Sequence, residues 1–501
     1  MLSISVLQIN ATLGNFEANG KQLLEAAERA KKEGSAFLCA PLGALSGFPV
    51  GAFSRRAEFL LDQKKTFEQL AKDLPIPALF GMVPGLVFVQ NGQSRLVVNG
   101  EVLTVAGKQI GIFTHLEALK ESVTDLKLRG AQAAVVVAAD PYRRQRPSKR
   151  LELAKEAAKK AGIPVLFVNL VGGADQWVFD GASFALNAQG ELTHQLASCA
   201  QDFRTMDLAS ERIDAVPTED MEELYDALVL ALGDYVRKNG FKEVQIGLSG
   251  GVDSALTAAI ASDALGAENV HALMMPTQFT ADLSLSESKR LAENLGIHYA
   301  VRPIGELFEA YRKALAEDFA GKSWDATEEN LQARIRGNLL MAHANKFGRL
   351  VIATSNKSES AAGYATLYGD TAGAFEAISD VYKTDVWALC RWRNARAGKE
   401  LIPEAIISRA PSAELREGQK DSQSLPEYAV LDAVLRLYVD EGKSVSEIVR
   451  QGFDKELVQR IVRMTHRAEF KRQQCPIGAH VSAVSFSSEA WKYPMTVWLK
   501  R

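Results

Sequence analysis

Short apolar runs alternate with helical patterns through the first two hundred residues. The runs ISVLQI, AAVVVAA and IPVLFVNLV are rich in β-branched residues, and amphipathic stretches such as QLLEAAERAKKEG and RLELAKEAAKKAG lie between them. This alternation predicts βα units. Both helical stretches end at a glycine, Gly34 and Gly162, a common helix stop. The later segment GASFALNAQGELTHQL predicts an antiparallel hairpin that turns at Asn187 to Gly190.

The pattern changes after Met206. The segment DLASERIDAVPTED is polar and contains a proline, which predicts a linker over 206–220. Thr218 precedes a predicted amphipathic helix that Gly240 ends before the strand VQIGL. The apolar stripe of that helix comprises Met221, Leu224, Leu228, Leu232 and Tyr235. We therefore expect an α/β protein with a first domain over 1–205 and a second over 221–501.

Composition and net charge exclude several classes of protein. The chain has 501 residues, 47% of them hydrophobic and 24% charged, with a net charge of −3, so it is neither disordered nor built to attract nucleic acid. No apolar run approaches the ~20 residues of a membrane span. Four cysteines without a CxxC pair argue against disulfides and zinc and favour the cytoplasm. We interpret the basic run PYRRQRPSKR as a solvated loop that opens a helix.

The strand VQIGL leads directly into the loop Ser249, Gly250, Gly251, Val252, Asp253, Ser254 and then into a helix. Strand, glycine loop and helix form a phosphate cradle, because glycines let backbone N–H groups approach phosphate oxygens and the helix N-terminus attracts negative charge. Ser249 and Ser254 add hydroxyl donors, and Asp253 is placed to hold Mg²⁺ against a phosphate. No GKS or GKT follows the glycines, so the loop is not of the Walker type.

This loop resembles the SGGxDS loop of ATP pyrophosphatases, which make adenylates. Downstream, HALMMPTQFT, ENLQARIRGNLLMAHANKFGRLVIATSNKSESAAGYATLYGD, ISDVYKTDVWAL, PSAELREGQKDSQSLPEY and FKRQQCPIG resemble the synthetase domain of NAD synthetases. The resemblance spans most of 241–480. It implies a parallel-sheet domain of the ATP-pyrophosphatase (adenine nucleotide α-hydrolase-like) class.

The resemblance also implies roles for single residues. Asp253, Lys383 and Glu359 match catalytic positions, and the carboxylates Asp253 and Glu359 match the magnesium-linked ones. The positions implied for ATP binding are Ser249, Gly250, Gly251, Asp253, Ser254, Thr354 and Lys383. Those implied for deamido-NAD are Asn330, Arg334, Glu359, Asp370 and Lys471. Asp421 matches as well, with a less defined role.

The first domain resembles the nitrilase-type glutaminase of long NAD synthetases, an α/β sandwich, as its opening VLQINATLGNFEANGKQLLEAAERAKKEGSAF indicates. That family uses a Glu, Lys and Cys triad. Here Leu42 stands at the glutamate position and His115 at the cysteine position, and the lysine-bearing segment has no counterpart between GMVPGLVFVQ and GKQIGI. Cys39 lies in an apolar strand, where a small buried residue is the usual explanation. The resemblance thus implies a glutaminase domain that has lost its triad.

The hypothesis from sequence is an NAD synthetase that uses ATP, Mg²⁺ and free ammonia to amidate deamido-NAD, as a homo-oligomer built on a dimer of synthetase domains. Three alternatives stay open. In the first, glutamine is the nitrogen source, through a rescued triad or through a separate glutaminase that docks and supplies ammonia. In the second, the chain is another adenylating amidotransferase, which the segment NLQARIRGN argues against. In the third, both domains are non-catalytic and regulatory, which the intact SGGVDS loop argues against.

Overall fold

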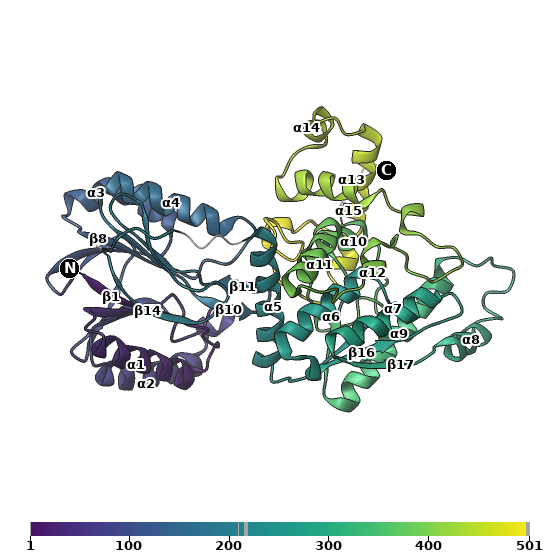
Figure 1. Ribbon diagram of the computed structural model, residues 1–501, viewed down its shortest axis with the longest axis horizontal. Helices are drawn as coiled ribbons and strands as arrows, with labels where there is room; N and C mark the ends of the chain where they lie inside the picture. The colour runs from purple at the N-terminus through teal and green to yellow at the C-terminus, as the bar shows by residue number, and fades with distance from the viewer. Residues whose placement is uncertain (1, 209, 215–218, 497–501) are drawn as a thin grey trace. The chain divides into compact units, whose positions relative to one another are not determined.

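The computed structural model describes residues 2–208, 210–214 and 219–496 (Figure 1). The chain forms two compact units, Met1–Glu223 and Leu224–Arg501. Both are α/β, as the sequence predicts. Among the described residues, no helix combines the length and the apolar composition needed to cross a bilayer. The four cysteines are free.

The first unit contains two six-stranded sheets. The first sheet has the order β14 (Asp202–Asp207), β1 (Ser3–Gln8), β2 (Phe37–Cys39), β3 (Ala78–Met82), β4 (Gly85–Gln90) and β5 (Gln93–Val97). The second has the order β13 (Leu192–Gln195), β12 (Phe184–Leu186), β9 (Val165–Val168), β8 (Ala133–Val137), β7 (Lys108–Phe113) and β6 (Glu101–Val105). A separate ribbon joins β10 (Val171–Ala174) to β11 (Trp177–Asp180).

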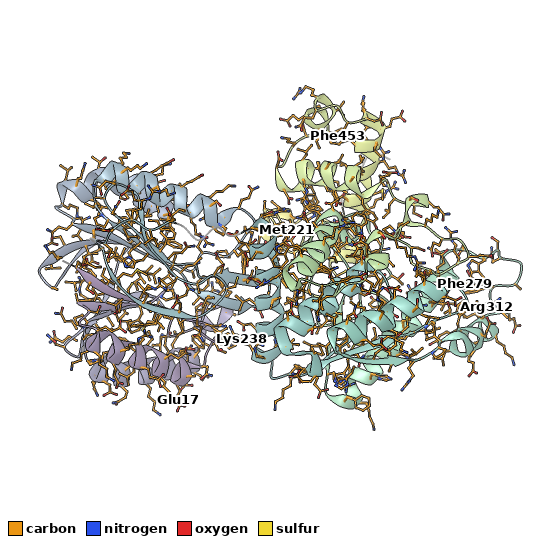
Figure 2. The ribbon with its side chains drawn as sticks, viewed as in Figure 1. Glu17, Met221, Lys238, Phe279, Arg312 and Phe453 are labelled. Carbon is orange, nitrogen blue, oxygen red and sulfur yellow. The ribbon has the colours of Figure 1, made fainter. Side chains whose placement is uncertain are left out.

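Helices cover the outer faces of both sheets. The first sheet carries α1 (Phe16–Lys32) and α2 (Ala57–Asp73), which follows the 3-10 turn η1 (Gly51–Arg55), and the second carries α3 (Leu116–Leu128) and α4 (Arg146–Ala161) (Figure 1). Side chains fill the space between the sheets (Figure 2). Buried apolar residues such as Val6, Ile112 and Val135 form one core cluster with strands of both sheets. The result is a four-layer α-β-β-α sandwich, the fold expected of a nitrilase-like domain.

Only residues 98–100 connect the two sheets between β5 and β6. β5 is the last strand of the first sheet and β6 the last of the second, so the chain crosses between them in three residues. Asn99, at the centre of this connection, accepts a hydrogen bond from the backbone N–H of Thr114 at 3.0 Å. The short connection therefore lies beside the end of β7.

Several local predictions can be compared with the structure. The hairpin at Asn187 to Gly190 is confirmed by the antiparallel pairing of β12 with β13, and Gly162 ends α4 with a φ of +66°. β14 continues to Asp207, so the strand extends into the predicted linker. The predicted helix is α5 (Asp220–Lys238), whereas Thr218 lies outside the described residues.

The solvated interpretation of PYRRQRPSKR is wrong for Arg150. The run does open a helix, since α4 begins at Arg146. Arg150, however, is only 1% exposed and donates to Asp180 at 2.7 and 2.8 Å and to Asp140 at 2.9 Å. Buried charges persist where they are paired in this way. The basic run is therefore partly an internal ion network.

The second unit is built on a five-stranded parallel sheet, in the order β17 (His298–Val301), β16 (Val270–Met274), β15 (Val244–Gly247), β18 (Leu350–Ala353) and β19 (Phe375–Glu376). Its longer helices are α5, α6 (Val252–Leu265), α7 (Asp282–Leu295), α8 (Gly305–Ala314), α9 (Ala326–Phe347), α11 (Lys383–Ala397), α13 (Tyr428–Leu435) and α15 (Lys455–Arg467). Its shorter ones are α10 (Lys357–Ala362), α12 (Glu404–Ser408), α14 (Val445–Arg450) and α16 (Glu469–Arg472). Short turns η2 (Ala267–Asn269), η3 (Asp421–Gln423), η4 (Arg436–Asp440) and η5 (Glu489–Trp491) complete it.

The central strands of this sheet place the predicted phosphate loop. β15 lies between β16 and β18, and its carboxyl end leads through the loop into α6. Ligands bind at the carboxyl ends of strands in open parallel sheets. The site is therefore expected where β15, β16 and β18 end.

Candidate active site

The phosphate loop adopts a conformation that suits glycine. Gly250 has a φ of +82°, and a Cβ there would lie 2.7 Å from the carbonyl oxygen of Ser284. The hydroxyls of Ser249 and Ser254 are 3.2 Å apart, and Ser249 Oγ accepts from the N–H of Gly251 at 3.2 Å. No described side chain caps the start of α6, which leaves its first N–H groups available to an anion. The loop is thus a phosphate cradle.

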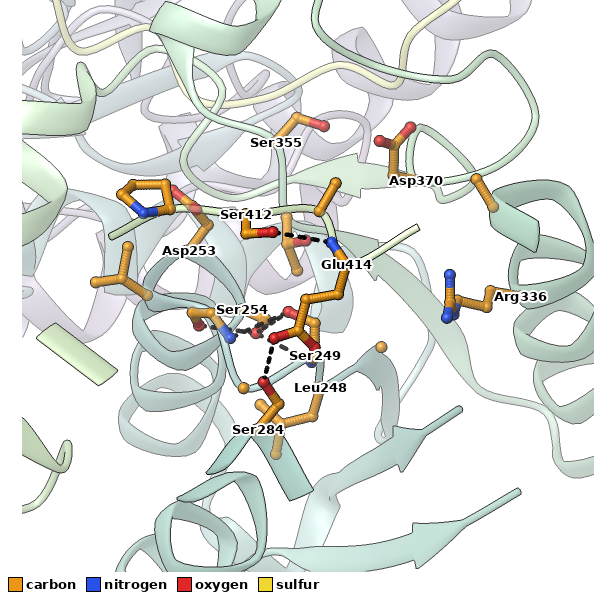
Figure 3. Close-up of a pocket in the computed structure, with 18 of the residues that line it drawn as sticks. Leu248, Ser249, Asp253, Ser254, Ser284, Arg336, Ser355, Asp370, Ser412 and Glu414 are labelled. Atoms are coloured by element: carbon orange, nitrogen blue, oxygen red, sulfur yellow. Dashed lines mark hydrogen bonds between the residues drawn. The ribbon is translucent and has the colours of Figure 1, made fainter. Parts of the chain in front are cut away.

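A cavity of about 270 Å³ opens above this loop (Figure 3). Nine of the residues predicted from sequence line it: Ser249, Gly250, Gly251, Asp253, Ser254, Thr354, Glu359, Asp370 and Lys383. Asp421 lines it too and accepts from the hydroxyl of Tyr428 at 2.9 Å. Residues more than 100 positions apart in the sequence therefore meet at one site.

Lys383 lies between two carboxylates at one side of the cavity. Its ammonium is 3.1 Å from Glu359 Oε1 and also donates to Asp253 Oδ2. Burial lowers the pKa of Lys383, but the two carboxylates outweigh it, and the pKa is raised overall. Burial raises the pKa of Glu359 to about 8, although Lys383 acts in the opposite direction. The cluster therefore carries one buried cation against two acidic groups.

Asn356 connects this cluster to helix α10. Its side-chain nitrogen donates to Asp253 Oδ1 at 2.8 Å, and its side-chain oxygen accepts from the N–H of Glu359 at 2.9 Å as the N-cap of the helix. The backbone N–H of Asn356 donates to Glu359 Oε2 at 3.4 Å, so this one residue contacts both carboxylates. The sequence analysis missed this residue, although the spacing of Asn356 and Glu359 is a capping-box signal.

The two carboxylates fit a magnesium ion that is shared with a phosphate. Asp253 and Glu359 present hard oxygen ligands to the same ammonium, and Mg²⁺ in nucleotide sites takes one or two carboxylates together with phosphate oxygens. The described residues contain no group of three or more His, Cys, Asp and Glu that could hold a metal alone. A bound nucleotide would have to complete the coordination.

Four of the five residues implied for deamido-NAD, all but Glu359, lie in or against one segment, 363–370. Asn330 accepts from Thr366 Oγ1 at 2.7 Å, Arg334 donates to the carbonyl of Leu367 at 3.2 Å, and Lys471 donates to the carbonyl of Ala365 at 2.7 Å. These three side chains hold the segment but do not line the cavity. Asp370, which does line it, has a pKa that burial raises to about 6.

In the first unit, the two residues predicted to stand at triad positions follow strand ends. Leu42 comes shortly after β2 and its N–H donates to the carbonyl of Ala138 at 3.2 Å. His115 comes directly after the end of β7 and the residue Thr114, whose hydroxyl lies 3.0 Å from His115 Nδ1. Cys39 is fully buried in β2, and burial raises the pKa of its thiol, which opposes formation of a thiolate.

The sequence profile of the NAD synthase family matches residues 224–475. The chain is 37% identical to a glutamine-dependent NAD(+) synthetase from Thermotoga maritima, with 99% of this chain and 98% of the relative covered. The chain belongs to the NAD synthase family. The structure of a glutamine-dependent NAD+ synthetase from Acinetobacter baumannii, in complex with ADP, matches with a TM-score of 0.78 at 33% identity over 99% of this chain and 98% of that one. A glutamine-dependent NAD(+) synthetase structure from Cytophaga hutchinsonii shares the fold, with a TM-score of 0.84 at 20% identity over 99% and 97%.

The alignment of this NAD synthase family member with its Thermotoga relative contains gaps in this chain. The alignment extends over 569 positions, 68 more than the 501 residues of the chain. At least that many positions of the alignment therefore have no residue from this chain.

Further residues of this NAD synthase site escape the sequence analysis. Arg336 lines the cavity and is half-buried, and its Nε donates to the carbonyl of Met275 at 2.9 Å. Burial lowers its pKa to about 10. Glu414 accepts from Ser284 Oγ at 2.8 Å and also pairs with Arg409 (Figure 3). Arg336 lies two positions after Arg334 in NLQARIRGN, which is the one signal that could have identified it.

Proposed function

We propose that the protein makes NAD from deamido-NAD, ATP and free ammonia through an adenylated intermediate, in the cytoplasm. Residues 221–501 act as the synthetase domain, 206–220 as a linker and 1–205 as a glutaminase-like domain without its triad. The observation that carries the synthetase activity is the Asp253, Lys383 and Glu359 cluster beside a phosphate loop in one cavity.

The reaction needs two steps. The nicotinate carboxylate of deamido-NAD attacks the α-phosphorus of ATP and pyrophosphate leaves. Ammonia then attacks the acyl carbon and AMP leaves. Adenylation is required because oxide is a far worse leaving group than AMP.

The residues of the cavity suit the first step. The serine hydroxyls and N–H groups of the loop bind phosphate oxygens, and Lys383 stabilises the negative charge that develops during transfer. Asp253 and Glu359 would hold Mg²⁺, which supplies charge neutralisation at the phosphates when bound. Asn356 keeps both carboxylates oriented. Asn330, Arg334, Glu359, Asp370 and Lys471 are the proposed contacts to deamido-NAD.

The ammonia part of the proposal is supported by the first unit. Amide hydrolysis by a nitrilase-type site needs a thiolate nucleophile and a general base. Leucine at position 42 cannot accept a proton, and the connection 98–100 contains no lysine. The thiol of Cys39, fully buried and with a raised pKa, is a poor substitute.

Glutamine use is the second candidate, and the names of the relatives favour it, since those relatives are called glutamine-dependent. In this chain it would require a rescued site or a separate glutaminase that supplies ammonia. Both candidates share the synthetase chemistry and differ only in the nitrogen source.

We also propose a homo-oligomer in which a second copy covers the segment 363–370. Tyr368 in this segment is 64% exposed and Phe470 beside Lys471 is 50% exposed. Two exposed aromatic rings near residues proposed to bind substrate favour burial against another surface. Sedimentation velocity of the full chain with and without deamido-NAD would test this assembly.

The deciding experiment measures NAD formation from deamido-NAD, ATP and Mg²⁺ with ammonium or glutamine as the only nitrogen source. Ammonia that contaminates glutamine is removed beforehand with glutamate dehydrogenase. We expect activity with ammonium and none with glutamine, and loss of activity in Asp253→Asn. A glutamine-supported rate comparable to the ammonium rate would overturn the ammonia proposal.

A second assay measures the adenylation step of the synthetase separately from the nitrogen source. Exchange between ATP and labelled pyrophosphate, with deamido-NAD present and no nitrogen source, reports adenylation alone. Exchange that depends on deamido-NAD supports the synthetase, and its absence would favour the regulatory alternative. Addition of a cell extract of the source organism, followed by purification, would reveal a separate glutaminase as a stoichiometric second chain.

A further inference from the structure

Glu376 is a buried acid that the proposed mechanism does not use. It lies on β19 opposite Ala353 of β18, the strand that leads to Thr354 and Ser355 in the cavity wall. The residue is 2% exposed, and its N–H donates to the carbonyl of Ile477 at 2.8 Å. The side-chain oxygen Oε1 has no hydrogen-bond partner among the described residues.

The surroundings of Glu376 are acidic. The hydroxyl of Ser355 hydrogen-bonds to the carboxyl group, and the charged neighbours that affect it are the carboxylates of Asp370 and Glu359. Ser355 and Asp370 both line the cavity, and the view in Figure 3 places them away from Ser249 and Ser284 of the phosphate side. Burial raises the pKa of the Cys475 thiol, and the carboxylates of Glu376 and Asp370 raise it further, so both acids lie within electrostatic range of this cysteine.

An arrangement of this kind is unfavourable without a ligand. A buried carboxylate needs a cation or several donors, and a second acid nearby adds repulsion. Within the described part of the chain, Glu376 takes part in no ion pair. Burial accordingly raises its pKa to about 8. A small cation with several N–H donors would satisfy Oε1 and offset the repulsion from Asp370.

We propose that Glu376 binds the ammonium ion that supplies the nitrogen, with Asp370 as a second acceptor. This inference rests on the proposed use of free ammonium. It assigns to Glu376 a substrate-binding role behind the cavity wall: Glu376 does not line the cavity itself, but its partner Ser355 and the neighbouring Asp370 do.

The chemistry balances with these two acids. An N–H bond of ammonium breaks, its proton moves to Glu376 Oε1, and the electron pair stays on nitrogen to give NH₃. The nitrogen then attacks the acyl carbon of the adenylate, the carbon–oxygen bond to AMP breaks, and the second proton passes from nitrogen to Asp370. A carboxylate in an apolar site is a stronger base than one in water, which makes the first transfer less unfavourable.

The test compares wild-type enzyme with Glu376→Gln, which keeps the shape of the side chain but removes its ability to accept a proton. We expect pyrophosphate exchange within about twofold of wild type and a KM for ammonium that rises by roughly tenfold or more. Glu293→Gln, on the exposed face of α7, serves as a matched control and should leave both values unchanged.

Hydroxylamine provides a readout that a merely structural role would not give. It is a neutral nucleophile at the assay pH, so it needs no cation site and no prior loss of a proton. We expect Glu376→Gln to use hydroxylamine at a rate within about twofold of wild type while it loses efficiency with ammonium. Equal losses with both nucleophiles would overturn the inference.

The remaining outcomes are distinguishable. Pyrophosphate exchange without any ammonium activity in the wild type would refute the proposed function and this inference with it. Ammonium activity in the wild type with an unchanged ammonium KM in Glu376→Gln would refute the inference alone. Activation of the wild type by potassium that Glu376→Gln lacks would assign the site to a monovalent metal instead. If Glu376→Gln fails to fold, Glu376→Asp, which retracts the charge, is expected to raise the ammonium KM with exchange retained, and an unchanged KM there refutes the inference.

Discussion

Asn356 positions Asp253 through a hydrogen bond of 2.8 Å from its side-chain nitrogen. The oxygen of the same amide caps helix α10, and the Asn356 backbone N–H donates to Glu359 Oε2, so the two carboxylates proposed to hold magnesium share one orienting residue. Positioning groups of this kind stabilise a catalytic site by fixing side-chain rotamers rather than by contact with substrate.

Substitutions at Asn356 should separate its two roles. Asn356→Asp keeps an N-cap oxygen but replaces the donor to Asp253 with a like charge, so we expect near-normal stability and a raised Mg²⁺ requirement for pyrophosphate exchange. Asn356→Ala loses the cap as well and should cost about 1 kcal/mol of unfolding free energy. Urea denaturation and magnesium titration of the exchange rate measure the two effects. Equal magnesium dependence in wild type and Asn356→Asp would contradict the positioning role.

Replacement of Lys383 by methionine should abolish adenylation. The change removes the ammonium that contacts both Asp253 and Glu359 and leaves two half-buried acids in mutual repulsion. We expect pyrophosphate exchange to fall roughly hundredfold or more. Exchange assays at saturating ATP and deamido-NAD check this, and Lys399→Met on the exposed surface is the control. A loss that higher ATP concentration fully reverses would mean that Lys383 only binds ATP.

Glu376 should make stability depend on pH in a defined direction. Its pKa rises from 4.5 to about 8 on folding, so the folded chain holds the proton more tightly than the unfolded chain. Its contribution is therefore favourable below pH 4.5 and is lost as the pH rises toward 8. The free energy of unfolding of Glu376→Gln relative to wild type should increase over that window, by at most about 1.4 kcal/mol per pH unit. Urea denaturation at pH 5, 6.5 and 8 measures the difference in unfolding free energy between the variant and wild type. A difference that stays constant over this range would show that Glu376 is ionised throughout.

Lys357 should be essential for the stability of the second unit. It is fully buried and donates to Asp440 at 2.9 Å, Ser482 at 2.6 Å and the carbonyl of Val484 at 2.8 Å. Lys357→Met leaves Asp380 and Asp440 without their cation, which should cost about 3–5 kcal/mol. Limited proteolysis should then cut the segment around Ser482 faster than in wild type. An unchanged denaturation midpoint would show that the acids find other partners.

The sequence predicts the phosphate loop well because its information is local. Gly250 needs positive φ and the two serines lie within six residues of each other, so spacing alone identifies the cradle. The roles of Glu359 and Lys383 are implied only by the family resemblance, since nothing in the sequence around either residue indicates that the two contact each other and that Lys383 pairs with Asp253.

Glu376 and Arg150 could not be predicted in this way. Glu376 lies on a two-residue strand, and it is buried by partners such as Ile477, about 100 residues later. Arg150 lies in a basic run, which favours a solvated interpretation, but its acidic partner Asp180 comes thirty residues further on. In both cases the burial of a charge depends on tertiary neighbours, which hydrophobic periodicity does not report.

The crossing from β5 to β6 through residues 98–100 has an evolutionary consequence. Under the proposed function, single substitutions at Leu42 and His115 could restore a glutamate and a cysteine, but the lysine would need new chain inserted between two sheet edges. An insertion there must also displace Asn99 from Thr114. If the proposed function holds, a return to glutamine use through the first unit's own site would therefore require a change in backbone length as well as substitutions.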